Sequence, residues 1–99
     1  MAQPIISSDG TLQITRHSIV YPTMGPKAVQ GAVKNNSTET ADAEIKVDFY
    51  DAFENMLGSV VGIVKDINPG ETKLFDIWAE RLPDMYEIEE HKIDYLKKV

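Results

Sequence analysis

The chain has no cysteine among its 99 residues, and it is short of basic residues and of long apolar runs. Without cysteine, disulfide bonds and thiolate metal sites are excluded. Sixteen acidic residues against ten basic ones give a formal net charge of −6. That charge repels a phosphate backbone, so we expect no nucleic-acid partner. No apolar run approaches the roughly 20 residues that a membrane helix requires, so we expect no membrane span in this chain.

The sequence also lacks the motifs that indicate catalysis. No nucleophile elbow or oxyanion-forming glycine loop accompanies its serines. The two histidines, His17 and His91, have no spacing that would bring them together with a carboxylate around zinc. We expect them at the surface or in a strand pair. The chain is therefore predicted not to be an enzyme, with no catalytic residue, no cofactor and no metal-binding residue.

The length is that of one domain with a single modest core. Residues 1–10 are expected to form a leader segment that ends in the Asp9-Gly10 turn pair, and residues 11–99 a single domain. The first residues, MAQPIISSDG, lack the basic and apolar regions of a signal peptide.

Strict alternation in residues 43–51, AEIKVDFYD, is the strongest structural signal. Ala43, Ile45, Val47 and Phe49 fall on one side of the chain, as in a strand with one dry face. Similar patterns predict strands over 11–21 (with a bulge near 16–18), 27–35, 40–51, 56–64, 72–78 and 86–96. For the last segment, a short helix over 87–97 is the competing interpretation.

Turn residues separate these segments at intervals of about ten residues, which is typical of an antiparallel sandwich. In residues 68–71, Asn-Pro-Gly-Glu, glycine stands where a type II turn needs positive φ. We therefore predict an all-β fold, an immunoglobulin- or fibronectin-III-like antiparallel β-sandwich of six or seven strands.

Two details concern the expected core. Residues 56–64, MLGSVVGIV, are apolar on both parities, so this strand is expected to be covered on both faces or shielded on one face by a loop. Gly31 leaves space for a large neighbour from the facing sheet. The predicted core consists of Val29, Val33, Ile45, Val47, Phe49, Val61, Ile63, Phe75 and Ile77.

Three motifs then follow in order: VxGxVxN at residues 29–35, VDFYD at 47–51 and NPGET at 68–72, with Phe75 behind the last. This order resembles the FxLYD domains of bacteria and archaea, small β-sandwich modules named for a strand-ending motif. Here valine replaces the first Phe and Phe49 replaces Leu, while Tyr50 and Asp51 match. The resemblance covers about residues 27–78.

The resemblance implies a non-catalytic accessory or interaction domain, with no established catalytic residues. It also implies an extracytoplasmic location if an export signal was removed; otherwise the location would be cytoplasmic. The expected partner is another protein or part of the domain's own assembly, and a homodimer paired through an edge strand stays open. The alternative is a small protease-inhibitor-like or peptide-binding β-sandwich, inserting the loop at 51–55 or the turn at 22–26 into a partner.

The candidate interaction or turn positions are Tyr50, Asp51, Glu54, Asn55 and Trp78. At a strand end, Tyr50 and Asp51 are expected to be structural, with Asp51 capping the following loop through an Asx-type turn. Trp78 is expected as a plug over the end of the core. Asp48, together with Asp51, Glu54 and Asn55, offers oxygen ligands for a calcium-stabilised module, although the spacing is not that of an EF-hand.

Overall fold

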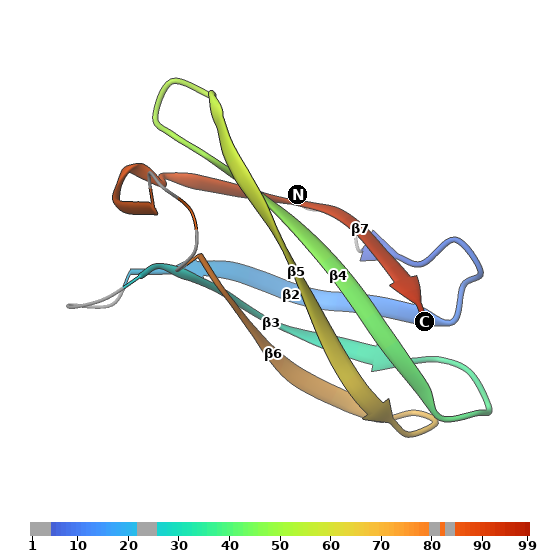
Figure 1. Ribbon diagram of the computed structural model, residues 1–99. Helices are drawn as coiled ribbons and strands as arrows, with labels where there is room; N and C mark the ends of the chain where they lie inside the picture. The colour runs from blue at the N-terminus through green and yellow to red at the C-terminus, as the bar shows by residue number, and fades with distance from the viewer. Residues whose placement is uncertain (1–4, 22–25, 80–81, 83–84) are drawn as a thin grey trace.

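The computed structural model describes residues 5–21, 26–79, 82 and 85–99. In these residues, seven strands form two antiparallel sheets that pack face to face (Figure 1). The elements are β1 (Ile5–Ile6), β2 (Leu12–Val20), β3 (Ala28–Asn35), β4 (Ala41–Tyr50), β5 (Met56–Ile67), β6 (Thr72–Trp78), the 3₁₀ turn η1 (Met85–Glu87) and β7 (Glu90–Lys98). The prediction of an all-β sandwich with six or seven strands is confirmed.

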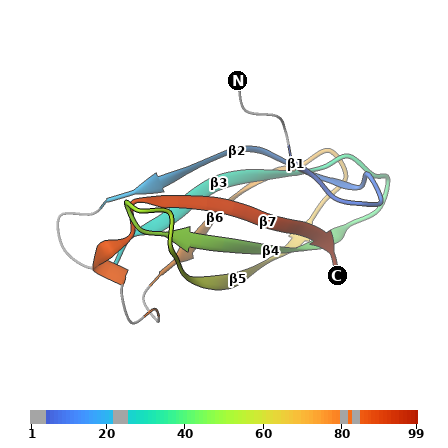
Figure 2. The same ribbon diagram turned by 90° about the horizontal axis from the view of Figure 1, so that it is seen from above.

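One sheet has the strand order β1-β2-β3-β6 and the other the order β5-β4-β7. Figure 2 shows the layer of β2 and β3 above the layer of β4 and β5. The inner face of β4 carries the alternating residues Ala43, Ile45, Val47 and Phe49, all fully buried. The alternation in the sequence therefore gives the central strand of the smaller sheet its dry face.

Residues 68–71 form the predicted turn, with glycine in the position that needs a positive φ. Gly70 has a φ of 77°, and the Glu71 amide donates to the Asn68 carbonyl at 2.9 Å. This turn joins β5 to β6 and carries the chain from one sheet to the other.

The helix considered for residues 87–97 is wrong, because residues 90–98 form strand β7. A bulge leaves Asp94 without a partner between Ile93, opposite Val47, and Tyr95, opposite Lys46. The bulge lies later than the expected position at 89–91. It separates the inward-facing Ile93 and Leu96 by three residues, which produces a helix-like spacing within a strand. In β2 the corresponding bulge is at Thr15, one residue before the expected range.

Part of the segment expected as a leader belongs to the larger sheet. Ile5 and Ile6 form β1 and pair with Ile14 and Gln13 of β2. Between the two strands, the Ser7 hydroxyl donates to the Asp9 carboxylate at 2.7 Å and accepts the Leu12 amide. The bond from Ser7, followed by those from Thr11, lowers the pKa of Asp9 to about 2.

The predicted core residues are buried with two exceptions, Val61 and Ile63, which are 50% and 48% exposed. The expectation that β5 is covered on both faces is wrong. Val60 and Gly62 lie opposite the buried Val47 and Ile45 and therefore face inward, so Val61 and Ile63 face outward. Among the described residues no third layer covers the smaller sheet, so the outer face of β5 stays partly open.

Gly31 is covered by Phe75, but not from the facing sheet as expected. Phe75 lies directly opposite Gly31 on β6, the neighbouring strand of the same sheet. A Cβ atom built on Gly31 would lie 2.6 Å from the Phe75 ring and 2.4 Å from the Arg16 carbonyl oxygen. The glycine thus allows an aromatic ring to lie flat across the strand.

Candidate functional site

The sandwich has two sides at which the edge of one sheet meets the edge of the other. On one side β5 lies next to β6, and on the other β2 approaches β7 (Figure 1). These sides differ in chemistry, and the apolar one is the strongest candidate for a binding site.

The apolar side is a groove between β5 and β6, which we call the β5–β6 groove. Hollows of about 340 and 580 Å³ lie along it and share Gly62, Asp76 and Ile77. The floor is close-packed, since a Cβ atom on Gly62 would lie 2.8 Å from Ile77 Cγ1. Leu82 borders the larger hollow, and its side chain lies over Gly58.

Exposed apolar side chains from both edges line the groove, together with Ser59, Lys65, Lys73 and Asp76. Val61 and Ile63 come from β5, while Leu74 and Trp78 come from β6. Trp78 is 44% exposed, so the expectation that it plugs the end of the core is wrong. Because successive side chains of a strand alternate between its faces, Trp78 points outward beside the inward-facing Ile77, and it therefore lies on the rim.

The backbone edge of β5 lacks the usual protection against pairing. Residues 59–64, SVVGIV, contain no charge and no proline, and they pair with β4 in unbroken register. Within the described residues, the other edges are short, charged or bulged, and β2, which β1 covers only at Gln13 and Ile14, is bulged at Thr15 and carries Arg16. Strand β1 has two residues, β6 carries Lys73 and Asp76, and β7 is charged and interrupted by its bulge.

The other predicted site residues form a separate feature, the loop between β4 and β5. One oxygen of the Asp51 carboxylate accepts the amides of Phe53 and Asn55 at 2.8 and 2.9 Å, and the other accepts the Asn55 side chain at 3.1 Å. Glu54 completes the turn with a φ of 65°. The hydrogen bonds, above all that from the Asn55 backbone, lower the pKa of Asp51.

Asp51 therefore caps the loop as expected, and the loop presents Phe53 at 84% exposure. Sequence reasoning overlooked Phe53. Tyr50 ends β4, and the Lys92 ammonium lies 5.1 Å from the centre of its ring. The structure thus brings Tyr50, Asp51 and Asn55 together at one end of the molecule and keeps Trp78 apart from them.

The oxygen ligands considered for calcium do not converge. Asp48 accepts a 2.6 Å hydrogen bond from Ser59 on the outer face of the smaller sheet, while the Asp51 carboxylate is occupied by the loop. No group of three or more His, Cys, Asp or Glu side chains suited to a metal ion occurs among the residues described.

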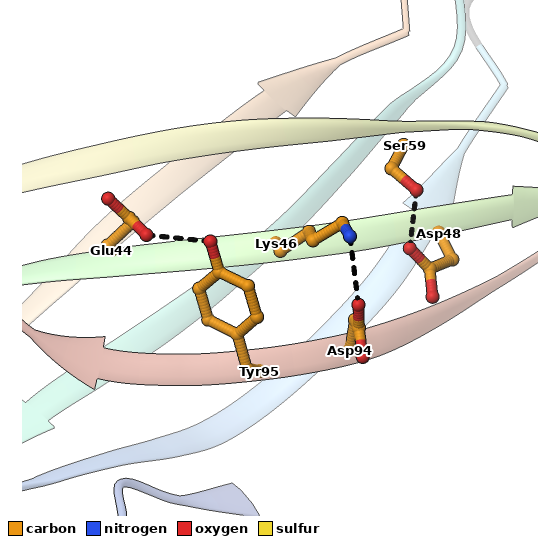
Figure 3. A network of polar contacts seen from close by, with 6 residues as sticks. All are labelled: Glu44, Lys46, Asp48, Ser59, Asp94 and Tyr95. Atoms are coloured by element: carbon orange, nitrogen blue, oxygen red, sulfur yellow. Dashed lines mark hydrogen bonds and ion pairs between the residues drawn. The ribbon is translucent and has the colours of Figure 1, made fainter.

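On the outer face of the smaller sheet, Glu44, Lys46 and Asp48 of β4 each contact a polar side chain of a neighbouring strand (Figure 3). Tyr95 donates to Glu44 at 2.6 Å, and Lys46 lies 3.2 Å from Asp94. The hydrogen bond from Tyr95 lowers the pKa of Glu44 and raises that of Tyr95. These partners lie across β4 and β7, so the contacts support the pairing of these two strands.

The histidines lie together, contrary to the expectation from their spacing. His17 of β2 and His91 of β7 face each other between the sheets, with Nδ1 of His17 2.7 Å from Nε2 of His91. Both are inward-facing, because His17 pairs with Gly31 and His91 with Phe49. Sequence spacing could not reveal this contact, because it joins residues that are 74 positions apart in different sheets.

Comparisons with protein-family models, with curated proteins and with solved structures found no match to this chain. Within the described segments, no helix is long and apolar enough to cross a membrane. In the part of the chain that the structure describes, the fold is a small all-β sandwich with an open groove between β5 and β6.

Proposed function

We propose that this domain is a non-catalytic binding module that receives an extended polypeptide segment at the β5–β6 groove. The observation that carries the proposal is the unprotected edge of β5 beside exposed apolar side chains on both rims. Exposed edges of this composition pair readily with other strands, which natural proteins use for recognition by strand addition.

The groove is suited to such a ligand. Backbone groups of β5 supply hydrogen bonds, and the hollows around Gly62 and Ile77 accept apolar side chains. Alternate residues of a bound strand would point to the same side, so apolar residues at every second position would fit the groove. The two-sheet architecture and the strand end at Tyr50-Asp51 further support an accessory domain of FxLYD type with an immunoglobulin-like fold.

The test begins with sedimentation of the purified protein from about 1 µM to about 1 mM, a range that detects weak self-association. A library of extended peptides is then selected for binding, and bound peptides are mapped by amide chemical shifts. We expect shifts centred on β5 and β6, whether the bound strand is a peptide or a second copy.

Matched variants make this test specific. Val61→Glu/Ile63→Lys places a charge opposite Lys46 and another opposite Glu44, so the edge gains charge while strand pairing is kept. The control is Ile6→Lys on β1, an outward residue of another edge that is 55% exposed. Binding should be lost in the first variant and retained in the second. Equal loss in both, or shifts confined to other surfaces, would refute the proposal.

A second candidate rests on the β4–β5 loop. Among the described residues, Phe53 is the most exposed large apolar residue, and Asp51 holds the loop beneath it through three hydrogen bonds. A pre-ordered loop with an apolar tip is the geometry with which small inhibitors enter protease clefts, because little ordering entropy is lost on binding. Inhibition of proteases that cleave after aromatic residues, lost in Phe53→Gly and kept in Val61→Glu/Ile63→Lys, would favour this function.

A further inference from the structure

We infer that the His17–His91 pair is a pH-sensitive latch, which holds β2 to β7 when both rings are neutral and releases them when both rings are protonated. The latch closes the side of the sandwich opposite the proposed binding groove, and it does not depend on that function. The inference rests on the geometry of the pair and on what surrounds it.

The rings meet through their nitrogens. Their centres are 4.9 Å apart, their planes are perpendicular, and the two nitrogens lie 2.7 Å apart between them. A neutral imidazole has one nitrogen that donates and one that accepts, so a neutral pair forms one N–H···N hydrogen bond. When both rings are protonated, neither facing nitrogen can accept and two positive charges adjoin. Double protonation therefore breaks the contact.

The residues around the pair do not compensate for a positive charge. Inward-facing neighbours are Ile19 on β2, Gly31 on β3, Phe49 on β4 and Ile93 on β7. Strand alternation directs the charged side chains of these elements to the outer faces: Arg16, Lys34, Glu44, Lys46, Asp48, Glu90, Lys92, Asp94 and Lys97. Strand β1 contributes only Ile5 and Ile6, and Lys98 lies seven residues further along β7.

At the nearer end of this side, the charged groups are Lys27 and Glu89, and the Glu89 side chain is exposed to solvent. The Lys27 ammonium donates to the Ile88 carbonyl and lies 4.8 Å from the centre of the Tyr21 ring. The Tyr21 hydroxyl donates to the Glu89 carbonyl at 3.0 Å. These two contacts also join the sheets near the beginning of β7, but neither places a carboxylate against the histidines.

Burial lowers the pKa of both histidines, and the charge of His17 lowers that of His91 further. A histidine with a lowered pKa in the folded state contributes stability above its ordinary pKa of 6.5. This contribution is lost as the pH falls below that value, because the open state then binds more protons. The latch should thus release below pH 6.5, as the pH falls through the lowered pKa values of the two rings.

The first experiment follows the histidine ring signals of the unmodified protein by NMR from about pH 8 to about pH 5, which spans the ordinary histidine pKa. We expect both rings to titrate below that value in coupled steps. Rings that titrate independently at the ordinary value would overturn the inference without the need for any variant.

The second experiment measures amide hydrogen-exchange protection in β2 and β7, with β4 as reference, over the same pH range. The opening equilibrium should rise by up to about tenfold per pH unit for each proton bound. The variant His17→Asn/His91→Gln replaces each facing nitrogen with an amide that does not titrate. Its protection in β2 and β7 should be independent of pH, and an unchanged pH dependence in this variant would contradict the latch.

Discussion

The two sides of this sandwich, where an edge of one sheet meets an edge of the other, are held together by different kinds of contact. Between β2 and β7, polar groups from both sheets meet: the histidine pair, and the contacts from Tyr21 and Lys27 to the chain before β7. Between β5 and β6, apolar side chains pack at the floor and stand exposed at the rim. A polar group that has formed its hydrogen bonds has no capacity left for a further partner. An exposed apolar rim, by contrast, can still bury surface by contact with another molecule.

This contrast suggests a division of roles within one small domain. The polar side has its hydrogen-bonding groups engaged within the chain, and its stability responds to pH. The apolar side leaves backbone and side chains available to a ligand. The following predictions test whether the sides differ in this way.

The largest effect is expected from adding a methyl group to two inward-facing glycines, Gly31 of β3 in the larger sheet and Gly62 on the floor of the β5–β6 groove. In Gly31→Ala, the new Cβ would meet the Arg16 carbonyl oxygen at 2.4 Å, a backbone atom that cannot move alone. In Gly62→Ala, it would meet the Ile77 side chain, which can rotate toward the groove. We expect losses of about 3 kcal/mol and about 1 kcal/mol respectively, measured by urea unfolding. Equal losses would mean that the surroundings of the two glycines are equally rigid.

An intermediate loss of stability is expected when the side-chain hydrogen bond between β5 and β4 is removed. Ser59→Ala removes the 2.6 Å hydrogen bond to Asp48, which is almost fully buried. We expect a loss of about 1 kcal/mol in the free energy of unfolding. In an Asp48→Ala background, the same substitution should cost much less, and a double-mutant cycle measures the difference. A loss that does not depend on Asp48 would show that the hydrogen bond does not stabilise β5.

A small effect on stability is expected at the rim itself. Val61→Glu/Ile63→Lys exchanges two half-exposed residues for charges opposite Lys46 and Glu44. We expect the free energy of unfolding to change by no more than about 0.5 kcal/mol, as for other surface substitutions. Thermal and urea unfolding would check this. A large loss would place Val61 and Ile63 in the stabilising core and weaken the case that they serve binding.

The smallest effect is local and concerns the loop at the end of the molecule. The pKa of Asp51 lies below its ordinary value of 3.8, so its stabilisation of the loop is complete above that value and is lost as the pH falls below it. Amide signals of Phe53 and Asn55 should therefore broaden or shift in acid, while those of central β4 stay unchanged. In Asp51→Ala, the same change should be present at neutral pH. If the amide signals of the loop change neither in acid nor in Asp51→Ala, Asp51 is not the residue that caps the loop.

The locations of the strands were predictable because local patterns determine them. The alternation of β4, the turn at Asn68 to Glu71 and the bounds of β6 were recognisable in the sequence. The Asx-type cap at Asp51 was also predictable, since its partners lie within four residues. The binding groove was not, because an apolar run such as residues 59–64 does not reveal whether it becomes a central strand or an edge.

Composition and periodicity by themselves thus determined a cysteine-free all-β domain and most of its core, because side-chain alternation is a property of the strand alone. The order of strands decided the rest. That order placed β5 at an edge, which left its backbone open beside the outward Val61 and Ile63, and it brought β7 against β2, which joined His17 to His91. Such contacts depend on how sheets stack, and residues distant in the sequence carry no local signal of it.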